Sequence, residues 1–132
     1  MERKDCKIME SPPKNSDLKI RTKLFAISII RFVRSLPKTE EAFIFGKQLL
    51  RSGTSVGANY RAARRGKSTA DFINKIIIVE EEADECCYWL ELLAESNIVD
   101  KKQIESLLKE ANELTAIFTA TGKTAKANRL NQ

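Results

Sequence analysis

Apolar residues recur at alternating steps of four and three positions in the middle of the chain. The positions that share this spacing are Phe72, Ile76, Val79, Ala83, Cys86, Leu90 and Leu93. Such a seven-residue repeat places them along one face of an α-helix. The run Ile76–Val79 alone would also suit a buried strand, but the helical spacing on both sides of it favours a helix. Ser68, followed three residues later by Asp71, resembles a capping box with Asp in place of Glu, so we predict a helix from residue 68 to about residue 95.

A second amphipathic segment precedes this helix near the start of the chain. Ser16 or Asp17 can cap it, and it is predicted to stop before Leu36-Pro37, because the residue before a proline is disfavoured in the α conformation. A wide apolar face is typical of a helix packed on a core. The residues on this face are Leu24, Phe25, Ile27, Ile29, Ile30, Phe32 and Val33.

Two more segments complete the set of predicted helices. One begins after Thr39, a residue type that caps helices, and is predicted to run to about Gly66. Glu40 and Glu41 lie in its first turn, where the helix dipole favours acids. The other begins after Asp100. Its inward positions are Ile104, Leu107, Leu108, Ala111, Leu114, Thr115 and Phe118.

The four helices are joined by connections of only a few residues, which makes sequential neighbours antiparallel. The predicted fold is therefore all-α, an antiparallel up-down-up-down four-helix bundle. A chain of 132 residues has room for one such domain. We expect the bundle to span residues 16–121. Residues 1–15 contain Pro12-Pro13 and no apolar period, and residues 122–132 lack large apolar residues apart from Leu130, so they are expected to form a mobile N-terminal arm and a mobile C-terminal tail.

The helix predicted over residues 40–66 is rich in small residues that disfavour helix formation. Each glycine costs about 1 kcal/mol relative to alanine, so a compensating role is expected. We favour a small-residue face, at positions 46, 50, 53, 57 and 60, against which another helix of the same bundle or of another subunit packs closely. A break or kink near residues 52–57 is the alternative. The candidates for helix packing or a subunit interface are Gly46, Gly53, Gly57, Tyr60 and Trp89.

Charge is distributed unevenly along the chain. Residues 1–67 contain 16 Lys and Arg against 6 Asp and Glu, whereas residues 68–132 contain 7 against 12. A basic half suggests a phosphate-bearing partner, although the two halves can also neutralise each other. Antiparallel packing of the second and third predicted helices brings Arg51 level with a cluster of acidic residues on the third. Arg51 could therefore form an ion pair with one of these acids or contact a phosphate, and both interpretations are kept. The acids considered for that pair are Glu81, Glu82, Asp84 and Glu85.

A second group of basic residues lies near the connection between the second and third predicted helices, where Asp71 is the only acid on the facing segment. Because this patch is not neutralised locally, it is the better candidate for phosphate binding. Without a recognised base-reading motif, we expect contacts to phosphates rather than to base edges. The candidate nucleic-acid-binding residues are Arg51, Arg61, Arg64, Arg65, Lys67 and Lys47.

Residue types suited to catalysis are poorly represented. The chain has no histidine, and Cys6, Cys86 and Cys87 form no C-x-x-C motif, so neither a zinc site nor a disulfide framework is predicted. A carboxylate-bridged metal centre would need inward acids on several helices and Glu-x-x-His pairs, which are absent. We expect no enzymatic activity, no catalytic residues, no metal, no cofactor and no small-molecule substrate.

The apolar run 25–33 is interrupted by Arg31, and no signal peptide precedes it, so a cytoplasmic location without membrane insertion is expected.

Three short stretches resemble a known family. They are Leu36-Pro37, Gln48-Leu49-Leu50-Arg51-Ser52 and Ser55-Val56-Gly57-Ala58-Asn59. Over roughly residues 20–120 the chain resembles the bacterial four helix bundle protein family, which includes the 23S rRNA-intervening sequence proteins and the accessory variability determinant of diversity-generating retroelements. The common Ala-Glu-Gly after the Asn is replaced by Tyr60-Arg61-Ala62-Ala63-Arg64, as in a subgroup that also has Glu-Glu-Ala-Asp-Glu, here residues 81–85.

The resemblance implies a homo-oligomer, specifically a homopentamer, with a basic surface or channel. It also implies a nucleic acid, RNA or DNA, as partner, and for retroelement members a reverse transcriptase. Together with the basic patch, it leads us to expect a noncatalytic nucleic-acid-binding or RNP-assembly protein. The alternative is a scaffold that recognises a partner protein through the acidic third helix or the small-residue face of the second.

Overall fold

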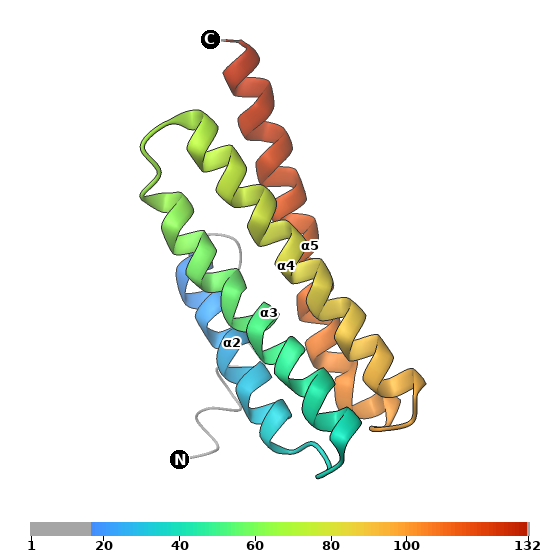
Figure 1. The fold of residues 1–132 in the computed structure, drawn as a ribbon. Coiled ribbons are helices and arrows are strands. Elements are labelled where there is room, and N and C mark those ends of the chain that lie inside the picture. Colours follow the sequence, from blue (N-terminus) through green and yellow to red (C-terminus); the bar gives the residue numbers. More distant parts are fainter. Residues whose placement is uncertain (1–16, 132) are drawn as a thin grey trace.

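The computed structural model describes residues 17–131, and these residues form four α-helices without a strand. In chain order they are α2 (Leu18–Arg34), α3 (Glu40–Arg64), α4 (Thr69–Glu95) and α5 (Lys101–Leu130). Successive helices run in opposite directions and are joined by short turns (Figure 1). The prediction of an all-α, antiparallel four-helix bundle is confirmed. The arm predicted over residues 1–15 lies outside the described residues.

The helix starts follow from capping residues that the sequence supplies. The side chains of Asp17, Thr39 and Ser68 each accept a hydrogen bond from a backbone N–H three residues later, at 3.1–3.2 Å. The capping box predicted at Ser68 is only half correct, because the Asp71 carboxylate accepts from the N–H of Lys67 at 3.3 Å. At the start of α5 the Gln103 side chain accepts from the backbone N–H of Asp100, at 2.8 Å.

The core is built mainly along α4, which packs against both α3 and α5. Phe25 and Ile29 of α2, Leu49 of α3 and Phe118 of α5 are completely or almost completely buried around it. The predicted seam of α4 is buried from Ile76 to Leu93, but at its first position Phe72 is half-buried and the adjacent Ile73 is buried instead. Helix α2 packs mainly on α3 and touches α5 over a small area.

The small-residue face of α3 packs against α2 of the same chain. A β-carbon at Gly53 would lie 2.9 Å from Ile29 Cγ1, and one at Gly57 would lie 3.1 Å from Thr22 Oγ1. Gly46 is similarly close to Leu36, at 2.8 Å. These glycines therefore permit a close approach of α2, which offsets their poor helix propensity. Helix α3 is continuous through residues 52–57, where a break was the alternative.

Helix α5 continues to Leu130, past residue 121, where we expected the bundle to end. The expected boundary is too early because it rested on the absence of large apolar residues. Gly122 is buried in the structure, and the Thr121 hydroxyl bonds to the Ile117 carbonyl at 2.8 Å. The turns that follow contain Ala and Lys, both good helix formers, so they stay helical with little tertiary packing.

Candidate nucleic-acid interface

Arg51 is placed against the acidic cluster of α4. Its Nη1 lies 3.2 Å from Glu82 Oε1, and its Nη2 forms an ion pair with Glu85. The hydrogen bond to Glu85 raises the pKa of the Arg51 guanidinium. Of the four acids considered for this pair, Glu81 and Asp84 are exposed and take no part in it. The guanidinium thus joins α3 to α4 and is already engaged by two carboxylates.

Lys47 is separated from the other candidate basic residues. It is exposed on the first half of α3 and lines a hollow at the α2–α3 turn, together with Pro37 and Phe43. Arg61 lies almost four helical turns further along the same helix. The six candidate phosphate contacts therefore do not form one surface.

Four of the candidates do gather at the C-terminal end of α3 and in the turn that follows. Arg61, Arg64, Arg65 and Lys67 are all exposed, and none of them has an ion-pair partner in the part of the chain that the structure describes. We call these four residues the α3 patch. Among the described residues, the acids that the structure places by the patch are Asp71, which is bonded to a backbone N–H, and Asp17 at the start of α2. The patch therefore keeps an excess of positive charge.

Tyr60 holds one member of the α3 patch in place. Its hydroxyl lies 3.2 Å from Arg64 Nη1, and the guanidinium carbon lies 5.9 Å from the ring centroid. The hydrogen bond from Arg64 to Tyr60 raises the pKa of the guanidinium. The Tyr60 ring itself is buried against Phe118, with centroids 5.4 Å apart, so it cannot act as a platform for a base.

Trp89 also packs within the chain. Its ring stacks on Phe45 at a centroid distance of 6.0 Å, and its Nε1 donates to Glu85 at 3.0 Å. Tyr88 packs edge-on against it and remains more than half exposed. These contacts account for Trp89 as part of the α3–α4 packing.

A buried arginine was missed by the sequence analysis. Arg21 is only 6% exposed, and its guanidinium lies 2.8 Å from carboxylate oxygens of both Glu110 and Glu113. The hydrogen bond to Glu110 raises the pKa of Arg21. The available signal was its spacing, since Arg21 precedes Phe25 and Ile29 at four-residue steps on the buried face of α2. This cluster connects α2 to α5, where the two helices otherwise touch little.

The two cysteines of α4 are structural thiols. Cys86 donates a hydrogen bond to Ser52 at 3.4 Å, and Cys87 donates one to Asn112 at 3.3 Å. Burial raises the pKa of Cys86 to about 12 and that of Cys87 to about 11, so both are protonated and poor nucleophiles at neutral pH. Cys6 lies outside the described residues.

Within residues 17–131 no group of His, Cys, Asp and Glu side chains could hold a metal ion, and none of the helices is long and apolar enough to cross a bilayer.

The three stretches that carry the family resemblance lie where helices meet. Leu36 is buried beneath Gly46, Ser52 is buried beside Cys86, and Gly57 lies against Thr22 of α2. A model of the 23S rRNA-intervening sequence protein family matches residues 14–120. The chain belongs to this family.

The chain is also similar to a solved structure, described as a protein of unknown function from the S23 ribosomal protein family of Bacteroides thetaiotaomicron VPI-5482. The two share 39% sequence identity and superpose with a TM-score of 0.74, over 80% of this chain and 97% of the other. No curated protein matches the chain significantly. The three stretches lie at contacts between helices, so they account for the shared fold. They do not identify a ligand, which depends on the exposed residues.

Proposed function

We propose that this protein is a noncatalytic nucleic-acid-binding or RNP-assembly protein that contacts phosphates through the α3 patch. The observation that carries the proposal is that four exposed cations at one end of α3 have no ion-pair partner in the described part of the chain. Unpaired Lys and Arg residues gain free energy on meeting phosphates through the release of condensed counterions.

The surroundings of the patch favour a binding role without base recognition. Its side chains lie at a helix end and a turn, and residues 17–131 include no long loop or strand there that could enter a groove. The α4 thiols are protonated and buried, so neither of them is poised as a nucleophile near neutral pH. Contacts to the phosphate backbone suit this set of groups best.

The test is binding of a labelled RNA hairpin and a DNA duplex across a salt series. Changing Arg61, Arg64 and Arg65 to Glu should abolish most of the binding and flatten the salt dependence. The matched control changes Lys38, Lys101 and Lys102 to Glu, which alters the net charge equally but at the opposite end of the bundle. Absence of binding at low salt by the folded parent protein would refute the proposal.

A second candidate function, a protein-interaction scaffold, is favoured by an apolar surface near the α2–α3 turn. Phe43 is 70% exposed there, beside a hollow of about 630 Å³ whose apolar walls include Val33, Pro37 and Leu50. The small-residue face considered for this role is covered by α2, so the hollow replaces it as the candidate surface. Capture of a partner that persists at high salt, and is lost on changing Phe43 to Ser, would support the scaffold.

Assembly into a homo-oligomer, with five subunits, and association with a reverse transcriptase are further parts of the proposal that rest on the family resemblance. An exposed apolar surface of this kind is a usual requirement for assembly. Light scattering coupled to size exclusion measures the number of subunits directly. If the protein is a monomer at micromolar concentrations, the proposed oligomer is refuted. Co-purification with a reverse transcriptase tests the proposed protein partner.

A further inference from the structure

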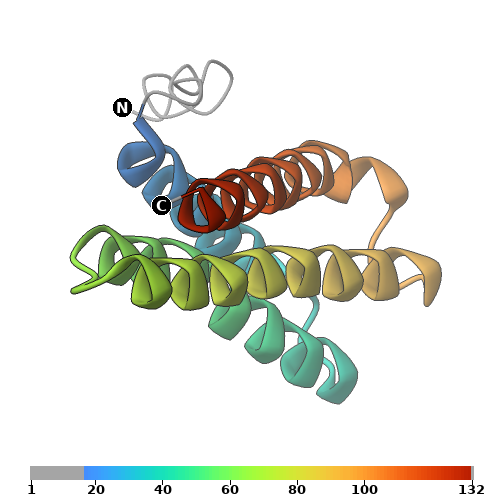
Figure 2. The ribbon, with the colours of Figure 1, turned by 90° about the horizontal axis from the view of Figure 1, so that it is seen from above.

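The end of α5 lies at the same end of the bundle as the end of α3 and extends past it (Figure 1). Gly122 packs beside Ile76 of α4, and a β-carbon there would lie 3.7 Å from its Cγ2. The last turns of α5 share a hollow of about 680 Å³ with Leu18 at the start of α2 and Phe72 at the start of α4. Figure 2 shows the C-terminal end of α5, the beginning of α2 and the α3–α4 turn all toward one end of the molecule.

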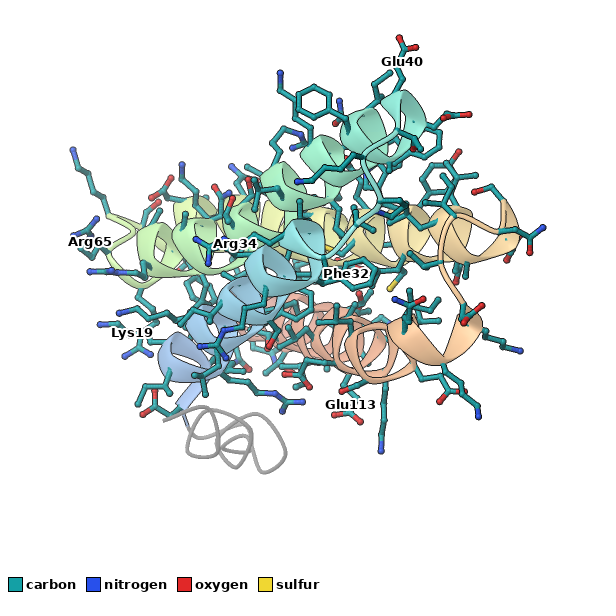
Figure 3. All side chains as sticks on the ribbon, turned by 90° about the horizontal axis from the view of Figure 1, so that it is seen from below. Lys19, Phe32, Arg34, Glu40, Arg65 and Glu113 are labelled. Atoms are coloured by element: carbon teal, nitrogen blue, oxygen red, sulfur yellow. The ribbon has the colours of Figure 1, made fainter. Side chains whose placement is uncertain are left out.

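This arrangement places basic side chains of three helices at the same end of the molecule. Lys123, Lys126 and Arg129 follow one another at three-residue steps on the last turns of α5, and all three are exposed. Such steps place neighbouring members on one side of a helix. Lys19 of α2 is exposed, and Figure 3 shows it toward the same end of the molecule as Arg65 and toward the opposite end from Glu40.

We propose that these residues and the α3 patch form one phosphate-binding surface, the basic end, and that its ligand is a nucleic-acid duplex. The inference rests on the proposed function and extends it, because the α5 cations lie in a segment that the sequence suggested was a tail. Asp17 and Asp71 are the acids at this end among the described residues, and both are engaged in backbone hydrogen bonds. Positive charge therefore predominates across three helix ends.

The preference for a duplex follows from the aromatic residues. Proteins that bind unpaired strands combine basic grooves with exposed aromatic rings on which bases stack. At the basic end Tyr60 is buried and Phe72 is half-buried, and the described residues of that end include no exposed aromatic side chain. The exposed rings, Phe43 and Tyr88, lie toward the other end of α3 and α4. A duplex offers its phosphates without any need for stacking.

A purely structural role for the α5 cations makes a different prediction. Basic residues near a helix C-terminus interact favourably with the helix dipole, so they would stabilise α5 without touching a ligand. In that case their removal would lower helix content or stability and leave the salt dependence of binding unchanged. Both quantities can be measured on the same variants.

The experiment compares two triple variants of α5 in the full chain. Changing Lys123, Lys126 and Arg129 to Gln removes the charges at the basic end. Changing Lys101, Lys102 and Lys109 to Gln removes the same number from exposed positions nearer the other end of the same helix. Binding of an RNA duplex, a DNA duplex and an unpaired strand of similar length is followed by fluorescence anisotropy between about 50 and 200 mM salt. Circular dichroism monitors the helix content.

For the duplexes, the basic-end variant should lower affinity at least tenfold and reduce the slope of log affinity against log salt by about two to three, close to one for each phosphate that is no longer neutralised. The control variant should bind like the parent. If the α3 patch variant loses binding while the two α5 variants behave alike, the composite surface is refuted and the proposed function stands. Tighter binding of the unpaired strand than of either duplex overturns the duplex assignment, and no binding by the parent overturns both proposals.

Discussion

Gly53 lies so close to Ile29 that a β-carbon on the glycine would meet three atoms of the isoleucine side chain within 3.2 Å. Ile29 is fully buried and branched at its own β-carbon, so it has little freedom to move aside. The absence of a side chain at Gly53 thus helps to set the separation of α2 and α3.

This contact predicts opposite effects of one substitution at two glycines. Gly53→Ala should destabilise the protein by about 1–2 kcal/mol, since overpacking outweighs the gain of about 1 kcal/mol in helix propensity. Gly122→Ala is the matched control and should stabilise by up to about 1 kcal/mol, because its new β-carbon would meet Ile76 at an ordinary 3.7 Å. Urea unfolding measures both. A stabilising Gly53→Ala would contradict the close packing of α2.

Arg21 is predicted to contribute to stability through its two carboxylate partners. Arg21→Met should lower the free energy of unfolding by about 3 kcal/mol, because it leaves Glu110, which is 19% exposed, without its cation. Combining it with Glu110→Gln should recover part of the loss. A double-mutant cycle by chemical denaturation gives the coupling free energy. Additive effects of the two changes would show that the pair does not act as a unit.

Arg51 is predicted to be a packing residue with little part in nucleic-acid binding. Its side chain is 47% exposed, so Arg51→Gln should cost no more than about 1 kcal/mol of stability despite the two carboxylates. The salt dependence of binding should equal that of the parent, because the guanidinium is already engaged by Glu82 and Glu85. If the variant reduced the slope of log affinity against log salt, Arg51 would have to be counted among the residues that contact phosphates.

The buried thiols predict a loss of stability in alkali. The folded-state pKa values of about 12 for Cys86 and about 11 for Cys87 lie above the ordinary value of 9.0. Above about pH 9 the unfolded chain releases these protons and the folded chain does not, so stability should fall as pH rises from there toward 12. Below pH 9 the thiols contribute no pH dependence.

The measurement is urea unfolding from pH 7 to pH 10.5 in a Cys6→Ser background, which leaves only the two α4 thiols. The control adds Cys86→Ala and Cys87→Ala, and its stability should depend less on pH in this interval. Reaction of the native protein with a thiol reagent at pH 8, at a rate faster than its unfolding, would show that the two thiols are accessible.

The sequence was most informative where one physical signal was strong. The regular spacing along α4 and the caps Asp17, Thr39 and Ser68 were enough to predict the four helices and their order. The small-residue face of α3 was predicted to pack closely against another helix. The sequence does not say which helix that is, so the packing of α2 on this face was not predicted. At the start of α4 the choice between Phe72 and Ile73 depends on the tertiary packing around the first turns, which a single-helix pattern does not contain.

The candidate site was less predictable because it depends on which helix ends meet. The ion pair of Arg51 followed from an antiparallel register, but the selection of Glu82 and Glu85 over their neighbours required the rotation of α4. Arg21 was overlooked because an arginine on an apolar face is usually expected in solvent. The α5 cations were assigned to a tail, since the absence of large apolar residues is a poor guide where alanine and lysine sustain a helix.

The grouping of cations at one end of the bundle gives the molecule an electric dipole moment along its long axis. At the other end, the exposed acids Glu40, Glu95 and Asp100 lie among exposed lysines, so the charges there largely offset one another. A highly charged polyanion therefore exerts a torque on the protein while the two are still separated by solvent, within about a Debye length. For the proposed nucleic-acid ligand, we therefore expect the protein to approach with its basic end turned forward, so low ionic strength should accelerate productive encounters as well as prolong the complexes they form.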